Sequence, residues 1–183
     1  MDEVIIRKVL EGDLEAFRHL ISKYKNHCFT LSRSILHSDL LAEEAVQDAF
    51  IKVFQNLHKF RREAAFSTWL YRILVNESLR KLKKDRKVLL ESYDEITLEE
   101  SVSVDPEVVE KLHTEEQKEF INSILDKLKS SESLLLKLFY LEEMSMDEIN
   151  SITGLSIPNI KVILHRARKN FAELYKTELT YHV

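Results

Sequence analysis

Hydrophobic residues recur every three or four positions along most of the chain, which is the spacing of amphipathic helices. The first such stretch covers residues 14–36, and Asp13 is placed to cap its start. After a polar break at residues 37–39, a second stretch covers residues 40–57, with an apolar stripe broader than one packing partner requires. A third helix is predicted over residues 67–84, where a Ser-Thr pair can begin it.

Shorter helical patterns fill the region after residue 117. Residues 120–128 form one amphipathic stretch, and Ser131 is placed to cap a following helix over residues 132–141. The chain has only two glycines and two prolines, the residues that sheets and phosphate-binding loops use in their turns. We therefore predict an all-α fold and exclude the glycine-rich nucleotide-binding motifs.

The pattern over residues 145–174 is that of a helix-turn-helix. Ser145 and Glu148 have the spacing of a capping box, Gly154 suits a left-handed turn, and Ser156 can cap a longer second helix. No acidic residue occurs in residues 156–170. Five side chains project away from the apolar stripe of this helix: Lys161, His165, Arg166, Arg168 and Lys169. A basic second helix is typical of a DNA recognition helix, although a plain helical hairpin would show the same turn.

Charge is distributed unevenly along a chain of net charge −4. Residues 61–87 contain nine lysines and arginines against three acids, with aromatic residues between them. Such a segment is typical of a surface that binds phosphates and stacks on bases, but a solvated helix with Trp69 in the core has the same composition. Residues 88–117 contain ten acids against one base, Lys111. They predict an acidic linker between two helical domains, residues 1–87 and 118–183.

Composition also indicates where the protein acts and which chemistry it lacks. The single cysteine, Cys28, lies in an apolar stripe, so we expect a buried thiol in a reducing compartment. No apolar run approaches the ~20 residues of a membrane span, and residues 1–13 lack the order of a signal peptide. We expect a cytoplasmic protein without membrane insertion. The histidines are scattered without metal-ligand spacing, and no nucleophile motif occurs, so we predict no metal, no cofactor and no enzyme activity.

Four segments of the chain resemble segments of one known protein family and occur in the same order. They are DLEAFRHLISKYKNHCFTLSRSIL, AEEAVQDAFIKVFQNLHKF, FRREAAFSTWLYRILVNESLRKLKKDR and GLSIPNIKVILHRARKNFAEL. Together they resemble a bacterial RNA polymerase sigma factor of the extracytoplasmic-function (ECF) class. In that class the first three belong to region 2, which binds polymerase and reads the −10 element, and the fourth to region 4. The resemblance implies a specificity subunit that binds core RNA polymerase, recognises a duplex −35 and a melted −10 element, and is controlled by an anti-sigma factor.

The resemblance also assigns site residues. A loop from residue 60 to 66 would receive a flipped base, Asn76 would contact a base, and basic side chains would hold phosphates. The −10 set is Phe60, Arg61, Arg62, Phe66, Arg72, Asn76, Arg80, Lys83 and Lys84. The −35 set is Pro158, Asn159, Lys161, His165, Arg166 and Lys169. The polymerase-binding set is Gln47, Asp48, Phe50, Lys52, Val53 and Phe54.

The chain departs from the family pattern at two places. Val162 and Ile163 stand where the family commonly has Ser-Arg, and Ala64 and Ala65 stand where small polar residues are frequent. The first departure affects the −35 preference and the second the flipped-base preference. The acidic linker would suit an RNA mimic in the polymerase exit path, and it would equally suit a solvated tether.

Two other classes of protein fit part of the sequence. One is a stand-alone helix-turn-helix repressor or activator, and the other is a helical interaction module whose basic stretches bind acidic partners. The basic segment distinguishes them, because a repressor needs no second basic, aromatic element far from its helix-turn-helix. A sigma factor needs one such element for each promoter element.

Overall fold

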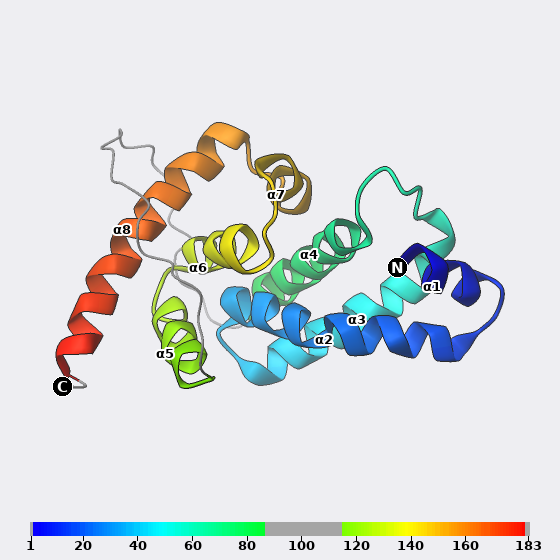
Figure 1. Ribbon diagram of the computed structural model, residues 1–183, viewed down its shortest axis with the longest axis horizontal. Coiled ribbons are helices and arrows are strands. Elements are labelled where there is room, and N and C mark those ends of the chain that lie inside the picture. The colour runs from blue at the N-terminus through cyan, green and yellow to red at the C-terminus, as the bar shows by residue number, and fades with distance from the viewer. Residues whose placement is uncertain (1, 87–114, 182–183) are drawn as a thin grey trace.

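The structure is a computed structural model that describes residues 2–86 and 115–181, and these residues form helices and no strand (Figure 1). The N-terminal unit, residues 2–86, contains α1 (Asp2–Leu10), α2 (Leu14–Leu36), α3 (Asp39–Asn56), the 3₁₀ turn η1 (Leu57–Lys59) and α4 (Phe66–Arg86). The C-terminal unit, residues 115–181, contains α5 (Glu115–Leu125), α6 (Ser130–Leu136), the π-helical turn η2 (Lys137–Leu141), α7 (Met146–Thr153) and α8 (Ile157–Tyr181). The all-α prediction is confirmed. The predicted linker lies mostly outside the described residues.

The N-terminal unit is built around α2, which packs against α3, α4 and α1. The side chain of Asp13 accepts a hydrogen bond from the Ala16 backbone N–H at 3.1 Å, so the predicted cap begins α2 as expected. His37 ends the helix in a left-handed conformation, with φ 51°. Ser38 then caps α3 through the Leu41 backbone N–H. These two caps reverse the chain within two residues and set α3 alongside α2.

The start of α4 differs from the predicted one. The helix begins at Phe66, one residue before the expected Ser-Thr start. Thr68 does not cap it, since it is the third residue of the helix, and its hydroxyl donates to Glu148 of α7 at 3.0 Å. A side chain that looks like a local cap in the sequence therefore makes a contact between the two units.

The C-terminal unit also departs from the pattern in one place. The single helix predicted over residues 132–141 is divided into α6 and the π-helical turn η2. Ser131 does not cap α6, whose N-cap residue is Lys129, without a side-chain cap. The neighbouring Ser130 hydroxyl instead lies within hydrogen-bond distance of the α2 end, 2.9 Å from the His37 ring.

The helix-turn-helix has the local geometry that its sequence predicts. Both hydrogen bonds of the capping box between Ser145 and Glu148 are present at the start of α7. Gly154 ends α7 with φ 75°, a conformation that a residue with a Cβ rarely adopts. Pro158 lies in the first turn of α8, where a missing backbone N–H costs little.

The first helix was not predicted. In α1, Ile6 and Val9 are buried against the N-terminal unit. Asp2 accepts hydrogen bonds from Lys23 and Tyr24 of α2, which fixes the start of α1 to that helix.

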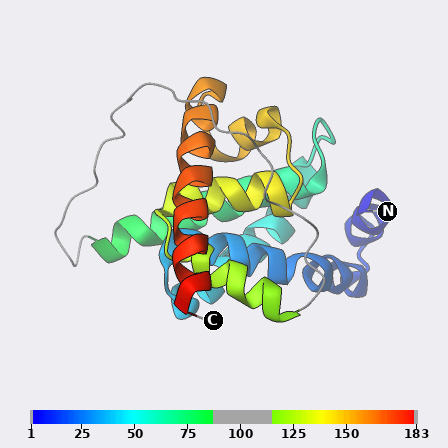
Figure 2. The same ribbon diagram turned by 60° about the vertical axis from the view of Figure 1, so that its left-hand side comes forward.

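The two units pack directly against each other. In Figure 2, α6 passes behind α8 and lies above α2, which it contacts, while α7 lies beside the loop that precedes α4. One cluster of buried apolar side chains runs from the N-terminal unit into the C-terminal unit without a break. Cys28 lies in this cluster with no exposed surface, as predicted for a structural thiol.

Candidate nucleic-acid interface

An open cavity of about 420 Å³ lies beside the start of α4. Most of its lining comes from the predicted −10 loop and the first turns of α4. The lining residues are Lys59, Phe60, Arg61, Arg62, Glu63, Ala64, Thr68, Trp69, Arg72 and Ser151. Ser151 belongs to α7, so the C-terminal unit supplies one side. We call this the α4 cavity.

Aromatic side chains form one wall of the α4 cavity. The rings of Phe60 and Trp69 are 5.3 Å apart and inclined at 39°, and Phe66 lies edge-on to Phe60 at 5.8 Å. Phe66 is buried, whereas Phe60 and Trp69 are half-buried. Trp69 therefore packs against the core and also reaches the cavity. Such a surface can stack on an unpaired base, because every base has a π-face.

The loop of the cavity is basic and holds one unusual backbone conformation. Arg62 has φ 60°, in the left-handed region that non-glycine residues seldom occupy at a cost of about 1–3 kcal/mol. Lys59, Arg61 and Arg62 are exposed, and Glu63 is the acidic residue among them. Four basic side chains, counting Arg72, thus surround a cavity with an aromatic wall. This combination suits a nucleotide, with its phosphate and its base.

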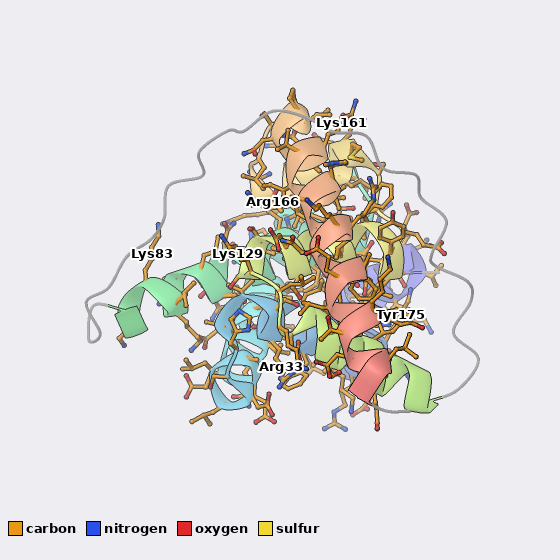
Figure 3. All side chains as sticks on the ribbon, turned by 90° about the vertical axis from the view of Figure 1, so that its left-hand side faces the viewer. Arg33, Lys83, Lys129, Lys161, Arg166 and Tyr175 are labelled. Carbon is orange, nitrogen blue, oxygen red and sulfur yellow. The ribbon has the colours of Figure 1, made fainter. Side chains whose placement is uncertain are left out.

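A row of exposed polar side chains continues from the cavity along α4. It consists of Arg72, Asn76, Arg80 and Lys83, and we call it the α4 row. The spacing of three or four residues places them on one face of the helix. Lys83 points away from the body of the molecule at the far end of α4 (Figure 3).

A buried carboxylate, which the sequence analysis did not identify, anchors this row to α3. Glu77 is 4% exposed and accepts two hydrogen bonds from Arg80, at 2.7 and 3.0 Å, and one from Lys52 of α3. Burial would raise the pKa of Glu77, but the hydrogen bonds from Lys52 and Arg80 outweigh it, and the pKa is lowered from its usual value. The signal in the sequence was an acid within the apolar stripe of α4, one residue before the buried Ser78.

We predict that Glu77→Gln destabilises the protein by about 1–3 kcal/mol at neutral pH, because Arg80 and Lys52 lose a charged acceptor. The lowered pKa means that the carboxylate stabilises the fold above the ordinary pKa of 4.5 and that this contribution is lost as pH falls through the folded pKa. The difference in unfolding free energy should therefore shrink below about pH 4.5. Urea unfolding of both proteins, followed by circular dichroism at neutral pH and below about pH 4.5, measures this difference. Glu43→Gln, at an exposed position of α3, should change stability by less than about 0.5 kcal/mol.

The predicted polymerase-binding residues divide into two groups on α3. Gln47, Lys52 and Phe54 are exposed, and Asp48 is partly so. Phe50 and Val53 are buried in the core, so their side chains support this surface from below. Asp48 lies 2.9 Å from the Lys81 ammonium and 3.6 Å from the Arg80 guanidinium. Ion pairs therefore connect the predicted polymerase face of α3 to the predicted DNA face of α4.

The predicted −35 residues lie along the first half of α8. Pro158, Lys161 and Lys169 are exposed, whereas Asn159 and His165 are partly buried. Figure 3 shows Lys161 pointing outward near the start of the helix and Arg166 further along it. The departure from the family pattern has a structural basis: Ile163 is completely buried, and Val162 is 36% exposed. Of these two residues, only Val162 has an exposed side chain that could contact DNA, and that side chain is apolar.

Arg166, a predicted −35 residue, also makes a contact inside the protein that the sequence did not reveal. Its Nε donates at 2.6 Å to Glu132 of α6, a carboxylate that is 1% exposed. Asn170 donates to the same carboxylate at 3.0 Å. Arg166 therefore neutralises a buried acid and joins α6 to α8. The sequence signal was again an acid placed among apolar residues.

Arg166→Ala should destabilise the protein by about 2–4 kcal/mol, because it leaves the buried Glu132 carboxylate without its cation. Lys161→Ala, at an exposed position on the same helix, should leave the melting temperature unchanged within about 2 °C. Thermal unfolding by calorimetry compares the two variants. Equal melting temperatures for wild type and Arg166→Ala would contradict this role.

Nothing in the described parts of the chain suggests a metal centre or a membrane span. Residues 2–86 and 115–181 contain no group of three or more His, Cys, Asp or Glu side chains placed to hold a metal ion. Among the same residues, no helix has the length and apolar character needed to cross a bilayer.

Comparison with known families matches both halves of the chain. The family model described as Sigma-70 region 2 matches residues 20–88, and the model described as Sigma-70, region 4, matches residues 109–171. The first match contains the α4 row and every lining residue of the α4 cavity except Ser151, and the second contains the helix-turn-helix. The two matches occur in the order that the sequence analysis expected.

Two curated relatives match nearly the full length. The ECF RNA polymerase sigma factor SigW of Bacillus subtilis is 30% identical over 176 residues, covering 90% of this chain and 91% of the relative. The ECF RNA polymerase sigma-E factor of Escherichia coli K12 is 30% identical over 177 residues, covering 92% and 91%.

The fold is similar to that of solved structures. One is the sigma factor RpoE of Bartonella quintana, solved with the anti-sigma factor NepR, with a TM-score of 0.66, 23% identity, and coverage of 89% of this chain and 98% of that chain. Another is CnrH, solved with the cytosolic domain of CnrY, with a TM-score of 0.65, 21% identity, and coverage of 96% and 97%. At these identities the likeness concerns the arrangement of helices.

Proposed function

The chain belongs to the ECF sigma factors of the sigma-70 family, and from that premise we propose which of its surfaces meet polymerase and promoter DNA. We propose that the stretch of α3 from Gln47 to Phe54 binds core RNA polymerase through its exposed side chains. The α4 cavity and the α4 row bind the melted −10 element, and the first half of α8 binds the duplex −35 element. The domain limits of residues 1–87, 88–117 and 118–183 belong to the same proposal.

One observation carries this assignment: the basic α4 cavity has an aromatic wall and opens onto a row of exposed polar side chains. A melted strand presents unpaired bases and a phosphate backbone, and such a surface can take both. Flipping a base costs a few kcal/mol of lost stacking, which stacking on Trp69 or Phe60 can offset. Asn76 lies next in the row and can bond to a base edge, while Arg72 and Lys83 can hold phosphates.

The remaining parts of the proposal follow from this role. A specificity subunit works through binding, so we assign no covalent reaction to this chain. We place it in the cytoplasm, where polymerase and promoter DNA are found. We also propose control by an anti-sigma factor, supported by the two fold neighbours that were solved with such partners or with a cytosolic partner domain.

The alternative of a stand-alone helix-turn-helix regulator is not favoured. The relatives are sigma factors over nine-tenths of the chain, and the matched region 2 contains a second basic surface far from the helix-turn-helix in sequence. An operator-binding repressor has no use for that surface.

Purified protein should co-elute with core RNA polymerase in size-exclusion chromatography. Phe54→Ala should weaken that binding about tenfold or more, because Phe54 is a large apolar side chain exposed on the proposed contact face of α3. Leu40→Ala removes an exposed apolar side chain from the opposite end of α3 and should leave the affinity unchanged. If the wild-type protein fails to co-elute and binds duplex DNA tightly by itself, the result would contradict the proposal and favour a repressor.

Asn76→Ala should reduce initiation on a cognate promoter about 10- to 100-fold, because it removes a proposed base contact worth about 1–3 kcal/mol. Binding to core polymerase should be unchanged. In vitro transcription and a polymerase pull-down, performed on the same preparation, separate these effects. Asn26→Ala removes an exposed amide from α2, outside the proposed contact surfaces, and serves as the control. Parallel loss of both activities in Asn76→Ala would count against a base-reading role.

A further inference from the structure

The outward side of α8 has an apolar centre near the start of the helix. The inward side consists of four residues without exposed surface: Ile160, Ile163, Leu164 and Ala167. Pro158, Val162, His165 and Lys169 follow one another at steps of four, three and four residues, so they share the opposite side of the helix. Pro158 and Val162 are both exposed, and we call them the apolar pair. They stand one turn apart.

Cations lie on both sides of the apolar pair. Lys161 is exposed on one side and points outward near the start of the helix (Figure 3). Arg168 follows on the same side, and its Nε donates to the Tyr140 hydroxyl at 2.8 Å. Arg166 lies towards the other side, where Glu132 holds it at 2.6 Å. Positive charge therefore flanks an uncharged centre.

This arrangement suits a helix that lies in the major groove of DNA. The groove admits one α-helix, and the N-terminal residues of a recognition helix contact the base edges. The phosphates lie along the two walls of the groove, where flanking cations can meet them. The side chains that reach the bases between those walls are then the ones at the centre of the outward face. In α8 the first two of these are the apolar pair.

An apolar side chain has one favourable partner in the major groove. Thymine carries a C5 methyl group there, whereas guanine, adenine and cytosine present hydrogen-bond donors and acceptors. Val162 has no polar side-chain atom, so it leaves such groups without a partner, at a cost in free energy. Contact with a methyl group instead removes apolar surface from water on both sides and is favourable. Val162 therefore favours thymine over the other bases.

We propose that Val162, with Pro158 beside it, is a specificity-determining residue of the −35 interface and selects a thymine by its C5 methyl group. The inference rests on the proposed binding of α8 to the −35 element. It deepens that proposal, because it names the base and the chemical group that one position of α8 recognises. Lys161 holds the backbone at this position and does not distinguish the bases.

Deoxyuridine provides a direct probe, because it pairs as thymidine does and lacks only the C5 methyl group. The holoenzyme, reconstituted from core polymerase and the full chain, first enriches a promoter from randomised duplexes. Each −35 thymine on either strand is then replaced in turn by deoxyuridine. Affinity is measured by gel shift at one fixed salt concentration, since the phosphate contacts depend on salt.

For the wild-type holoenzyme, one replacement should weaken promoter binding about three- to fivefold, as expected for one methyl group taken out of its contact. In the Val162→Ala holoenzyme, the thymine and uracil forms at that position should bind with nearly equal affinity. Val162→Thr retains one methyl group and should keep part of the preference. Lys161→Ala is the matched control: it should weaken both forms by the same factor and leave their ratio unchanged.

The proposal is overturned if the wild-type holoenzyme binds every uracil form as tightly as the parent promoter, or if the enriched −35 elements contain no thymine. A preference for thymine that persists unchanged in Val162→Ala also overturns it, because another residue or the stiffness of the DNA then explains the effect. Weaker binding of Val162→Ala to core polymerase, with an unchanged preference for thymine, would identify the apolar pair as a protein contact instead.

Lys161→Ala separates this failure from a failure of the proposed function. If Lys161→Ala weakens promoter binding while the methyl group has no effect, α8 still binds the −35 element and only the selection of thymine by Val162 is wrong. If neither Lys161→Ala nor a scrambled −35 sequence changes the affinity, the proposed role of α8 is itself wrong, and the inference fails with it.

Discussion

The burial of the last two turns of α2 on every face except that of Arg33 determines much of this structure. Leu31, Ser32, Ser34, Ile35 and Leu36 are all buried, and a helix buried on several faces needs a neighbour on each of them. The helices α3 and α4 cover part of this surface, and α6 of the C-terminal unit covers another part. Polar groups inside it are satisfied locally: Ser34 bonds to the Thr30 carbonyl, and Ser32 bonds to Ser78 of α4. The contact between the units is therefore an extension of the core.

Local patterns in the sequence predicted those features that depend on neighbouring residues. The bounds of α2, its Asp13 cap, the capping box at Ser145 and the left-handed Gly154 are all set within one or two helical turns. Local patterns do not predict the role of a side chain whose partner is distant in the sequence. Thr68 has the form of a cap but bonds across the units. The predicted 132–141 helix, which is divided into α6 and η2, is flanked by Ser130 and Glu142, and both contact the N-terminal unit.

The candidate site shows the same difference between features set by local sequence and features that depend on distant partners. Spacing and charge found the α4 row and the basic helix α8, because exposed faces follow helical periodicity. They did not find the buried acids Glu77 and Glu132, which hold Arg80 and Arg166. A held arginine has already lost most of its rotamer freedom, so a contact to DNA costs it less further entropy. An exposed lysine such as Lys161 must be ordered when it binds. Basic residues that look equivalent in the sequence thus differ in how rigidly they are presented.

The position of Cys28 has a practical consequence for chemical biology. The thiol lies at the centre of the shared core without exposed surface, and burial, together with the nearby Glu142, raises its pKa far above the usual range. The native protein therefore offers alkylating reagents no thiolate. A cysteine introduced anywhere on the surface can carry a dye or spin label while the natural one stays in place. The rate at which Cys28 itself is slowly modified then measures how often the core opens.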